Sequence, residues 1–209
     1  MQQQLDTTKR QKKSKETRKK LLDAMEFIME KYDYNTVTIR NICKVSGVSY
    51  GSFYNLFGSK ENFLRYYLTS DFVAFKEDYY RFNTDFEKLS DTEKSVDIFV
   101  CCAKYNLKKG LKFISGFYSP LNYTLCPLGN EGGKEYSFTP LVEEASGYLE
   151  RAREEGNLKA DADIESTVND YCFLFNGITF NWCISRGRYD IVRIVRSSLL
   201  ERIQKEMNP

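Results

Sequence analysis

The stretch 38–62, TIRNICKVSGVSYGSFYNLFGSKEN, constrains the fold of this chain more than any other part of the sequence. Its first apolar residues recur at the spacing of one helix face: Ile39, Ile42 and Cys43. Thr38 before them can cap a helix by accepting a free backbone N–H. Gly47 can end that helix because glycine tolerates a left-handed backbone conformation. Ser49 can cap a second short helix over 50–57, so the stretch predicts two helices joined by a turn.

Two short helices joined by a glycine-containing turn form a helix-turn-helix, whose second helix enters the major groove of DNA. Tyr50 and Gly51 lie in the first turn of that second helix, the part that meets base edges. Gly51 costs the helix about 1 kcal/mol relative to alanine, and it allows the backbone to approach DNA closely; the other interpretation is a tolerated surface glycine. The remaining candidates for phosphate or base contacts on this helix are Ser49, Ser52 and Asn55. Tyr50, Gly51 and Ser52 are the candidates for direct base readout.

Three further residues are candidates for contacts with the phosphate backbone. Lys60 begins the next helix, where free N–H groups favour an anion and a cation is locally unfavourable. This local cost indicates a phosphate-binding role, and Thr38 at the start of its helix is a similar candidate. Tyr54 has two interpretations: because it lies beside the inward-facing Phe53 and Phe57, it is either a core aromatic residue or a surface residue.

The segment resembles the DNA-binding domain of the tetracycline-repressor (TetR) family over about Thr17–Leu64. The matching residues are Thr38, Ile42, Gly47, Val48, Ser49, Gly51, Tyr54, Phe57 and Lys60, with Leu21, Leu22, Asp23, Ala24 and Phe27 upstream. The departures are Asp33 in place of the usual Gly, Cys43 and Ser46 in place of Ala, and Phe53 where Leu is common. None of these departures removes a DNA-facing group.

The resemblance implies both contacts and an architecture. It implies that Tyr54 and Lys60 are phosphate ligands. It also implies a ligand-responsive transcriptional regulator, most often a repressor, whose homodimer binds successive major grooves of a near-palindromic operator. A small-molecule effector would bind in the C-terminal domain of each subunit, and the last two long helices of each subunit would form a four-helix bundle.

The basic charge of the chain is concentrated at its N-terminus. Residues 1–20 contain eight Lys or Arg and two Asp or Glu, whereas the whole chain carries a net charge of only +2. Cations beside a helix-turn-helix suit the phosphate backbone, because each contact releases a counterion. We therefore interpret residues 1–16 as a basic arm with little fixed structure that contacts DNA, the alternative being a solvated tail.

The pattern along the chain predicts an all-α protein of about nine helices in two domains. The domains are a helix-turn-helix domain over 17–65, after the arm, and an effector-binding and dimerisation domain over 66–209. Ser90 and Glu93 have the spacing of a capping box, and Asp163 and Asp190 are suited to cap the last two long helices. Neither a secretory signal nor an apolar run of about 18 residues is found, so we expect a cytoplasmic protein.

The last two predicted helices are apolar on more than one side. Residues outside their main apolar stripes are Phe173, Leu174, Ile184, Ile191 and Leu200. A helix that is apolar nearly all round must be buried nearly all round. We therefore expect a homodimer through about 163–206, the alternative being burial inside one subunit.

An effector pocket is the less constrained part of the hypothesis. Aromatic residues on or near the irregular middle region are candidates to line it: Tyr105, Phe113, Phe117, Tyr123, Phe138 and Phe175. Asn176 is polar on an otherwise apolar helix and is a candidate donor to a ligand. Each aromatic residue has ordinary core packing as its alternative. The composition of this set favours an apolar or aromatic effector.

The residue types argue against catalysis. The chain has no His, which excludes Ser-His and Cys-His dyads and every His metal ligand. Its six Cys show no C-x-x-C pair, and the adjacent Cys101 and Cys102 could be a redox or metal sensor or, as we favour, small apolar residues. We therefore expect no enzyme activity, no cofactor and no metal. The alternative regulator is a DNA-bound protein-interaction factor without a small-molecule effector.

Overall fold

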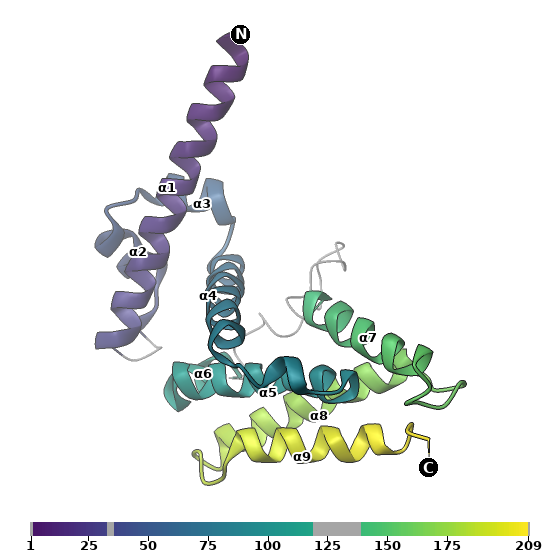
Figure 1. The fold of residues 1–209 in the computed structure, drawn as a ribbon. Helices are drawn as coiled ribbons and strands as arrows, with labels where there is room; N and C mark the ends of the chain where they lie inside the picture. The colour runs from purple at the N-terminus through teal and green to yellow at the C-terminus, as the bar shows by residue number, and fades with distance from the viewer. Residues whose placement is uncertain (1, 33–35, 119–138, 209) are drawn as a thin grey trace. The chain divides into compact units, whose positions relative to one another are not determined.

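The computed structural model describes residues 2–32, 36–118 and 139–208, with the backbone alone at 2–9, 117, 139 and 140 (Figure 1). The described residues form an all-α fold with nine α-helices, as the sequence predicts. Their bounds are α1 Gln2–Lys31, α2 Ile39–Ser46, α3 Tyr50–Phe57, α4 Lys60–Phe82, α5 Asp91–Lys109, α6 Leu111–Phe117, α7 Thr139–Glu154, α8 Ile164–Ile184 and α9 Ile191–Gln204. One 3₁₀ helix, η2, covers Phe86–Lys88.

The chain divides into two compact units within α4. Among the described residues, the N-terminal unit extends to Ser70 and the C-terminal unit begins at Asp71. The N-terminal unit therefore contains α1, α2, α3 and the first half of α4. The second half of α4 and all later helices belong to the C-terminal unit.

The N-terminal segment differs from the prediction. Residues 1–16 were expected to have little fixed structure, but α1 is helical from Gln2 onward and continues as one helix to Lys31 (Figure 1). The physical reason is composition: this segment contains neither Gly nor Pro, and Gln, Lys and Arg all have good helix propensity. Further along α1, Leu21, Met25 and Ile28 are fully buried and anchor the helix in the N-terminal unit.

Helix α5 forms the centre of the C-terminal unit. It packs against α7, α9, α6 and α8, while α8 and α9 lie side by side (Figure 1). Every residue from Ser95 to Ala103 is buried, so this part of the helix is enclosed on all sides. Its N-terminus has the predicted capping box: Ser90 Oγ accepts the Glu93 N–H at 3.3 Å, and Glu93 accepts the Ser90 N–H at 2.9 Å. The Ser90 N–H, and the Ser90 hydroxyl that also donates to Glu93 Oε2 at 2.8 Å, lower the pKa of Glu93, which keeps the carboxylate ionised.

A buried carboxylate connects three helices of this unit. Asp97 on α5 is 1% exposed. Tyr79 of α4 donates its hydroxyl to Asp97 Oδ2 at 3.1 Å, and Arg196 of α9 donates Nη2 to Oδ1 at 2.9 Å. Lys104 Nζ in turn donates to the Tyr79 hydroxyl oxygen at 3.1 Å. Burial and the Asp97 charge raise the pKa of Tyr79, so its hydroxyl remains protonated and able to donate.

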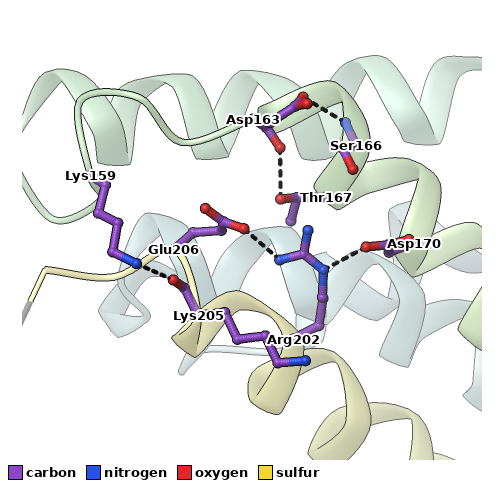
Figure 2. Close-up of polar contacts among 8 residues, drawn as sticks. All are labelled: Lys159, Asp163, Ser166, Thr167, Asp170, Arg202, Lys205 and Glu206. Carbon is purple, nitrogen blue, oxygen red and sulfur yellow. Dashed lines mark hydrogen bonds and ion pairs between the residues drawn. The ribbon is translucent and has the colours of Figure 1, made fainter.

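A second polar cluster holds the end of α9 beside the start of α8 (Figure 2). Arg202 donates Nε to Asp170 at 2.6 Å and Nη1 to Glu206 at 2.9 Å. Asp163 caps α8 as predicted, since its carboxylate accepts the Ser166 N–H at 2.9 Å. Because Arg202 is largely buried and Asp170 is half exposed, the pair contributes orientation more than a large stabilisation.

The described cysteines are buried or half buried, and burial raises the pKa of their thiols. Burial raises the pKa of the Cys101 thiol to about 12 and that of Cys102 well above its ordinary value. Both thiols are therefore protonated at neutral pH, and a thiolate is the reactive form. No cluster of three or more potential metal ligands is found within the described ranges. Cys126 lies outside them.

No described helix is both long enough and apolar enough to cross a bilayer.

Candidate nucleic-acid interface

The turn between α2 and α3 forms through local side-chain and backbone contacts. Thr38 Oγ1 accepts the Asn41 N–H at 3.1 Å and so caps α2. Gly47 then adopts φ +67°, the left-handed conformation that ends the helix. The Val48 N–H is satisfied by Ser46 Oγ at 3.2 Å. These residues fix the angle at which α3 leaves α2, as expected of a helix-turn-helix.

Helix α3 is anchored by aromatic residues on its inner face. Phe53 is fully buried and lies 5.3 Å, between ring centroids, from Phe63 of α4. Phe57 lies 5.6 Å from Phe53 and 5.0 Å from Phe63, so the three rings form one cluster. Edge and tilted contacts of this kind add to the stabilisation from burial. An isolated helix of eight residues is not stable in water, so α3 depends on packing through this cluster.

Arg18 of α1 supports the same cluster from another side, which the sequence did not predict. Its guanidinium carbon lies 5.2 Å from the Phe57 ring centroid and 5.1 Å from that of Tyr66. These are cation–π distances. The interaction places a positive charge beside α3 and links α1 to it. A basic residue in a basic segment gives no sequence signal that separates this role from simple exposure.

The outer face of α3 is open to solvent. Tyr50 and Tyr54 are 50% and 48% exposed, and Gly51, Ser52 and Asn55 are exposed too. The core interpretation of Tyr54 is therefore wrong, because about half of its surface is open to solvent although its ring lies 5.8 Å, between centroids, from that of Phe53. A methyl group built at Gly51 meets no atom within 4 Å. Packing inside the subunit therefore does not require glycine there.

The two serines at the start of α3 have different hydrogen-bonding capacity. Ser49 Oγ accepts the Ser52 N–H at 3.2 Å and donates to Ser52 Oγ at 2.9 Å. Ser49 is thus engaged as the helix cap. Ser52 keeps its own hydroxyl hydrogen, which makes it the better donor to a phosphate or a base.

The remaining predicted contacts lie at the edges of this surface. Thr38 is exposed at the start of α2, and Lys60 is half exposed as the first residue of α4. Ser59 caps α4 by accepting the Asn62 N–H at 3.1 Å. Thr38, residues 49–52 and Lys60 therefore lie at the N-terminal ends of α2, α3 and α4, where free N–H groups favour anions, whereas Tyr54 and Asn55 lie further along α3.

The structure describes the side chains of four of the predicted effector-pocket residues: Tyr105, Phe113, Phe175 and Asn176. Tyr105 packs against Phe72 and Phe75 and donates to Asp71 at 2.6 Å, whereas Phe175 packs against Phe99. Phe113 is buried. Asn176 accepts a hydrogen bond from Tyr118 at 3.1 Å. Tyr123, Phe138 and the side chain of Phe117 lie outside the described residues, so these residues remain predictions.

An apolar stripe on α8 faces solvent in the single chain. Phe173, Phe180 and Ile184 are 73%, 45% and 63% exposed, and Leu174 is 36% exposed. Residues 173, 177, 180 and 184 have the spacing of one helix face, and Gly177 lies on it. Leu200 of α9 is half buried, whereas Ile191 is fully buried. Ile191 was wrongly included among the apolar residues expected at a dimer interface, because it packs inside its own subunit.

Comparisons with known proteins agree with this geometry. Residues 21–67 match the model of the tetR family of bacterial regulatory proteins. The structure of FadR from Thermus thermophilus with lauroyl-CoA superposes with a TM-score of 0.68 at 17% identity, covering 92% of this chain and 96% of that one. RolR with resorcinol gives 0.64 at 16% identity, covering 91% and 88%. FadR from Bacillus subtilis with stearoyl-CoA gives 0.57 at 18% identity, covering 88% and 96%. At these identities the likeness concerns the fold. No curated protein matches the sequence significantly.

Proposed function

We propose that this chain is a tetR-family regulator, a homodimeric transcriptional repressor released from its operator by a small molecule. Residues 21–67 match the model of that family of bacterial regulatory proteins, and the fold resembles that of FadR from Thermus thermophilus. The outer face of α3 is the observation that carries the proposal. Two half-exposed tyrosines, an exposed glycine and a serine hydroxyl that can still donate lie on a helix whose inner face is fixed by the Phe53 cluster. A rigid helix with a polar, solvent-facing first turn suits insertion into a major groove.

Dimerisation is supported by the exposed stripe of α8. A contiguous apolar surface of this kind marks an interaction site. A second copy of the stripe is a self-complementary partner, as a two-fold interface requires. Two copies would present two α3 helices, which fits a near-palindromic operator with half-sites about 34 Å apart or somewhat more.

An effector is supported by the fold relatives that were solved with acyl-CoA thioesters or resorcinol bound. We propose an apolar or aromatic effector in the C-terminal unit. To release DNA it must bind the two conformations of the dimer unequally. Helix α4 is suited to transmit the change. It carries Lys60 at one end and, towards the other end, Tyr79, whose hydroxyl donates to Asp97.

Selection of genomic fragments by the purified protein tests the proposal. Recovery of one near-palindromic site, bound more weakly by a variant altered on α3, is the expected result. Fragments without a shared site would contradict sequence-specific regulation and leave only non-specific DNA association.

The oligomeric state can be measured separately. Sedimentation of the purified chain should give twice the 24.5 kDa of one subunit, and Phe173→Asp should produce a monomer. Val73→Asp, at another exposed apolar position, is the matched control and should remain dimeric. A monomeric wild-type protein at micromolar concentration would refute the α8 interface.

Removal of one hydroxyl from α3 tests the phosphate contact. Tyr54→Phe should weaken operator binding by about 0.5–1.5 kcal/mol, the net value of one hydrogen bond, without altering thermal stability. Tyr32→Phe, at another exposed tyrosine of the N-terminal unit, should leave affinity unchanged. Equal affinities of the Tyr54 variant and wild type would show that the hydroxyl does not reach DNA.

The role of Gly51 can be separated from its helix propensity. Gly51→Ala should stabilise the free protein by up to about 1 kcal/mol, because alanine favours the helix and the site is open. It should also weaken operator binding by about 1 kcal/mol, roughly fivefold, if the methyl group meets DNA. Gly147→Ala on α7, also sterically open, should change stability alone. Improved stability with unchanged DNA affinity would identify Gly51 as a tolerated surface glycine.

A further inference from the structure

A groove on the C-terminal unit is lined by none of the residues predicted to bind DNA or an effector. It lies between the second half of α4 and the second half of α5 and has a volume of about 520 Å³. Its lining residues are Phe75, Asp78, Tyr79, Phe82, Asn83, Lys104 and Lys108. This volume is within the range of small-molecule sites, roughly 300–1,000 Å³.

The α4 side of the groove is aromatic. The rings of Phe75 and Tyr79 are stacked, with centroids 6.3 Å apart and planes 11° from parallel. Phe82, one turn further along, is 76% exposed. Its ring gains little from packing inside the subunit, and leaving it in water forgoes about 25 cal/mol per Å² of apolar area. The groove therefore offers flat apolar surfaces that a ligand can cover.

The α5 side of the groove is cationic. Lys104 and Lys108 are one helical turn apart and share a face. Lys104 Nζ lies 4.5 Å from the Tyr79 ring centroid, and Lys108 Nζ lies 5.2 Å from that of Phe75. No carboxylate pairs with either ammonium group in the part of the chain that the structure describes. On the same helix, by contrast, Lys109 forms an ion pair of 2.5 Å with Asp71.

The acidic residue of the groove does not neutralise these lysines. Asp78 is paired with Arg81 at 3.0 Å, and both side chains are more than 60% exposed. The lining itself therefore carries two positive charges without a carboxylate partner and one negative charge that already has a partner. An anion entering the groove finds complementary charge, and a cation does not.

We propose that this groove binds a small organic anion with a flat apolar body, such as an aromatic carboxylate or sulfonate. The anionic group lies between Lys104 and Lys108, and the ring system covers Phe75, Tyr79 and Phe82. The two ammonium groups and the rings already lie in cation–π contact, so they are positioned before the ligand arrives and little order is lost on binding. This inference holds whether or not the chain binds an operator, because it concerns the C-terminal unit alone.

The two lysines differ in a way that matters for the experiment. Lys104 also donates to Tyr79, whose hydroxyl binds Asp97, so its replacement disturbs an internal hydrogen-bond chain. Lys108 is exposed and lies outside that chain. Lys108→Gln therefore removes charge from the groove without touching the core.

Titration of the full-length protein with 8-anilinonaphthalene-1-sulfonate tests the proposal directly. Its uncharged analogue, N-phenyl-1-naphthylamine, is the matched probe without the anionic group. Amide chemical-shift mapping should place the sulfonate at residues 75–83 and 104–108. Lys108→Gln should weaken sulfonate binding about threefold and the Lys104→Gln, Lys108→Gln double variant about tenfold, with the neutral probe changing less than twofold.

Of two further variants, one should tighten sulfonate binding and the other should leave it unchanged. Asp78→Asn removes the one negative charge of the groove and should tighten sulfonate binding. Lys88→Gln, at an exposed lysine outside the groove, should have no effect. Chemical-shift changes confined to other regions, or an equal response of both probes to the lysine variants, would overturn the proposal.

Discussion

Replacing Arg196 by methionine is expected to lower the free energy of unfolding by about 3 kcal/mol, because it leaves a buried charge without its cationic partner. Asp97 is 1% exposed, and the Arg196 guanidinium is its only ion-pair partner among the described residues. After the substitution, only the Tyr79 hydroxyl would still donate to the carboxylate. Denaturant unfolding followed by circular dichroism measures the change.

Replacing Asp97 should lower the free energy of unfolding less than replacing Arg196 does. This difference between the two substitutions is the sharper test. The Arg196 side chain is 39% exposed, so after Asp97→Leu its guanidinium can still reach water. We expect a loss of about 1–2 kcal/mol for that change. The double variant, Asp97→Leu with Arg196→Met, should recover part of the stability lost by Arg196→Met alone, since an apolar pair can replace a buried ion pair.

Arg193→Met, at an exposed position of the same helix, is the control and should change stability by less than about 0.5 kcal/mol. An equal loss in the Arg193 and Arg196 variants would show that the effect arises from α9 itself and not from the buried pair.

The ion pair between Asp97 and Arg196 is a contact that could not be predicted from the sequence. Asp97 and Arg196 are 99 residues apart in the chain, and helical periodicity has no means of connecting them. The surrounding sequence, SVDIFV, did contain a signal: a lone acidic residue within an apolar run, in the part of α5 that is buried on all sides. A charge there requires a partner, but the sequence does not identify which cation supplies it.

Local signals, by contrast, predicted most of the fold. The caps at Ser49, Ser90, Asp163 and Asp190 all form as expected, because each depends on a residue and a backbone N–H within three positions. The inward positions of Phe53 and Phe57 follow from helical spacing in the same way. Once these two residues define the buried face of α3, the residues on its opposite face must be exposed, and these include the candidates for DNA contacts.

Predictions that required knowledge of tertiary packing succeeded less often. Ile191 and Phe173 are both apolar residues outside the main stripes, yet one is fully buried and the other is 73% exposed. The groove between α4 and α5 was not predicted from the sequence for a similar reason. Its lysines and aromatic residues come from two helices, and only the packing of α4 on α5 brings them together.

Neutralising the basic residues near the start of α1 is expected to weaken operator binding about 30-fold at 0.15 M salt, if two phosphate contacts are lost. Arg10, Lys12, Lys13 and Lys15 are exposed, and their replacement by glutamine keeps a good helix former at each position. The slope of log K against log salt should become shallower by about 0.9 for each lost contact. Filter binding or fluorescence anisotropy over a salt series measures both quantities.

The helical form of this segment makes a more specific prediction than a disordered arm would. At about 100° per residue, Arg10 and Lys13 lie on one side of α1, and Lys12 and Lys15 lie on the opposite side. If α1 stays helical on DNA, only one of the two pairs can face the phosphate backbone. The two double glutamine variants carry the same charge change, so each is the control for the other. One pair should then account for nearly all of the change in slope. An equal effect of both pairs would show that the segment unwinds on DNA, and no effect of either would show that its charge is not used in binding.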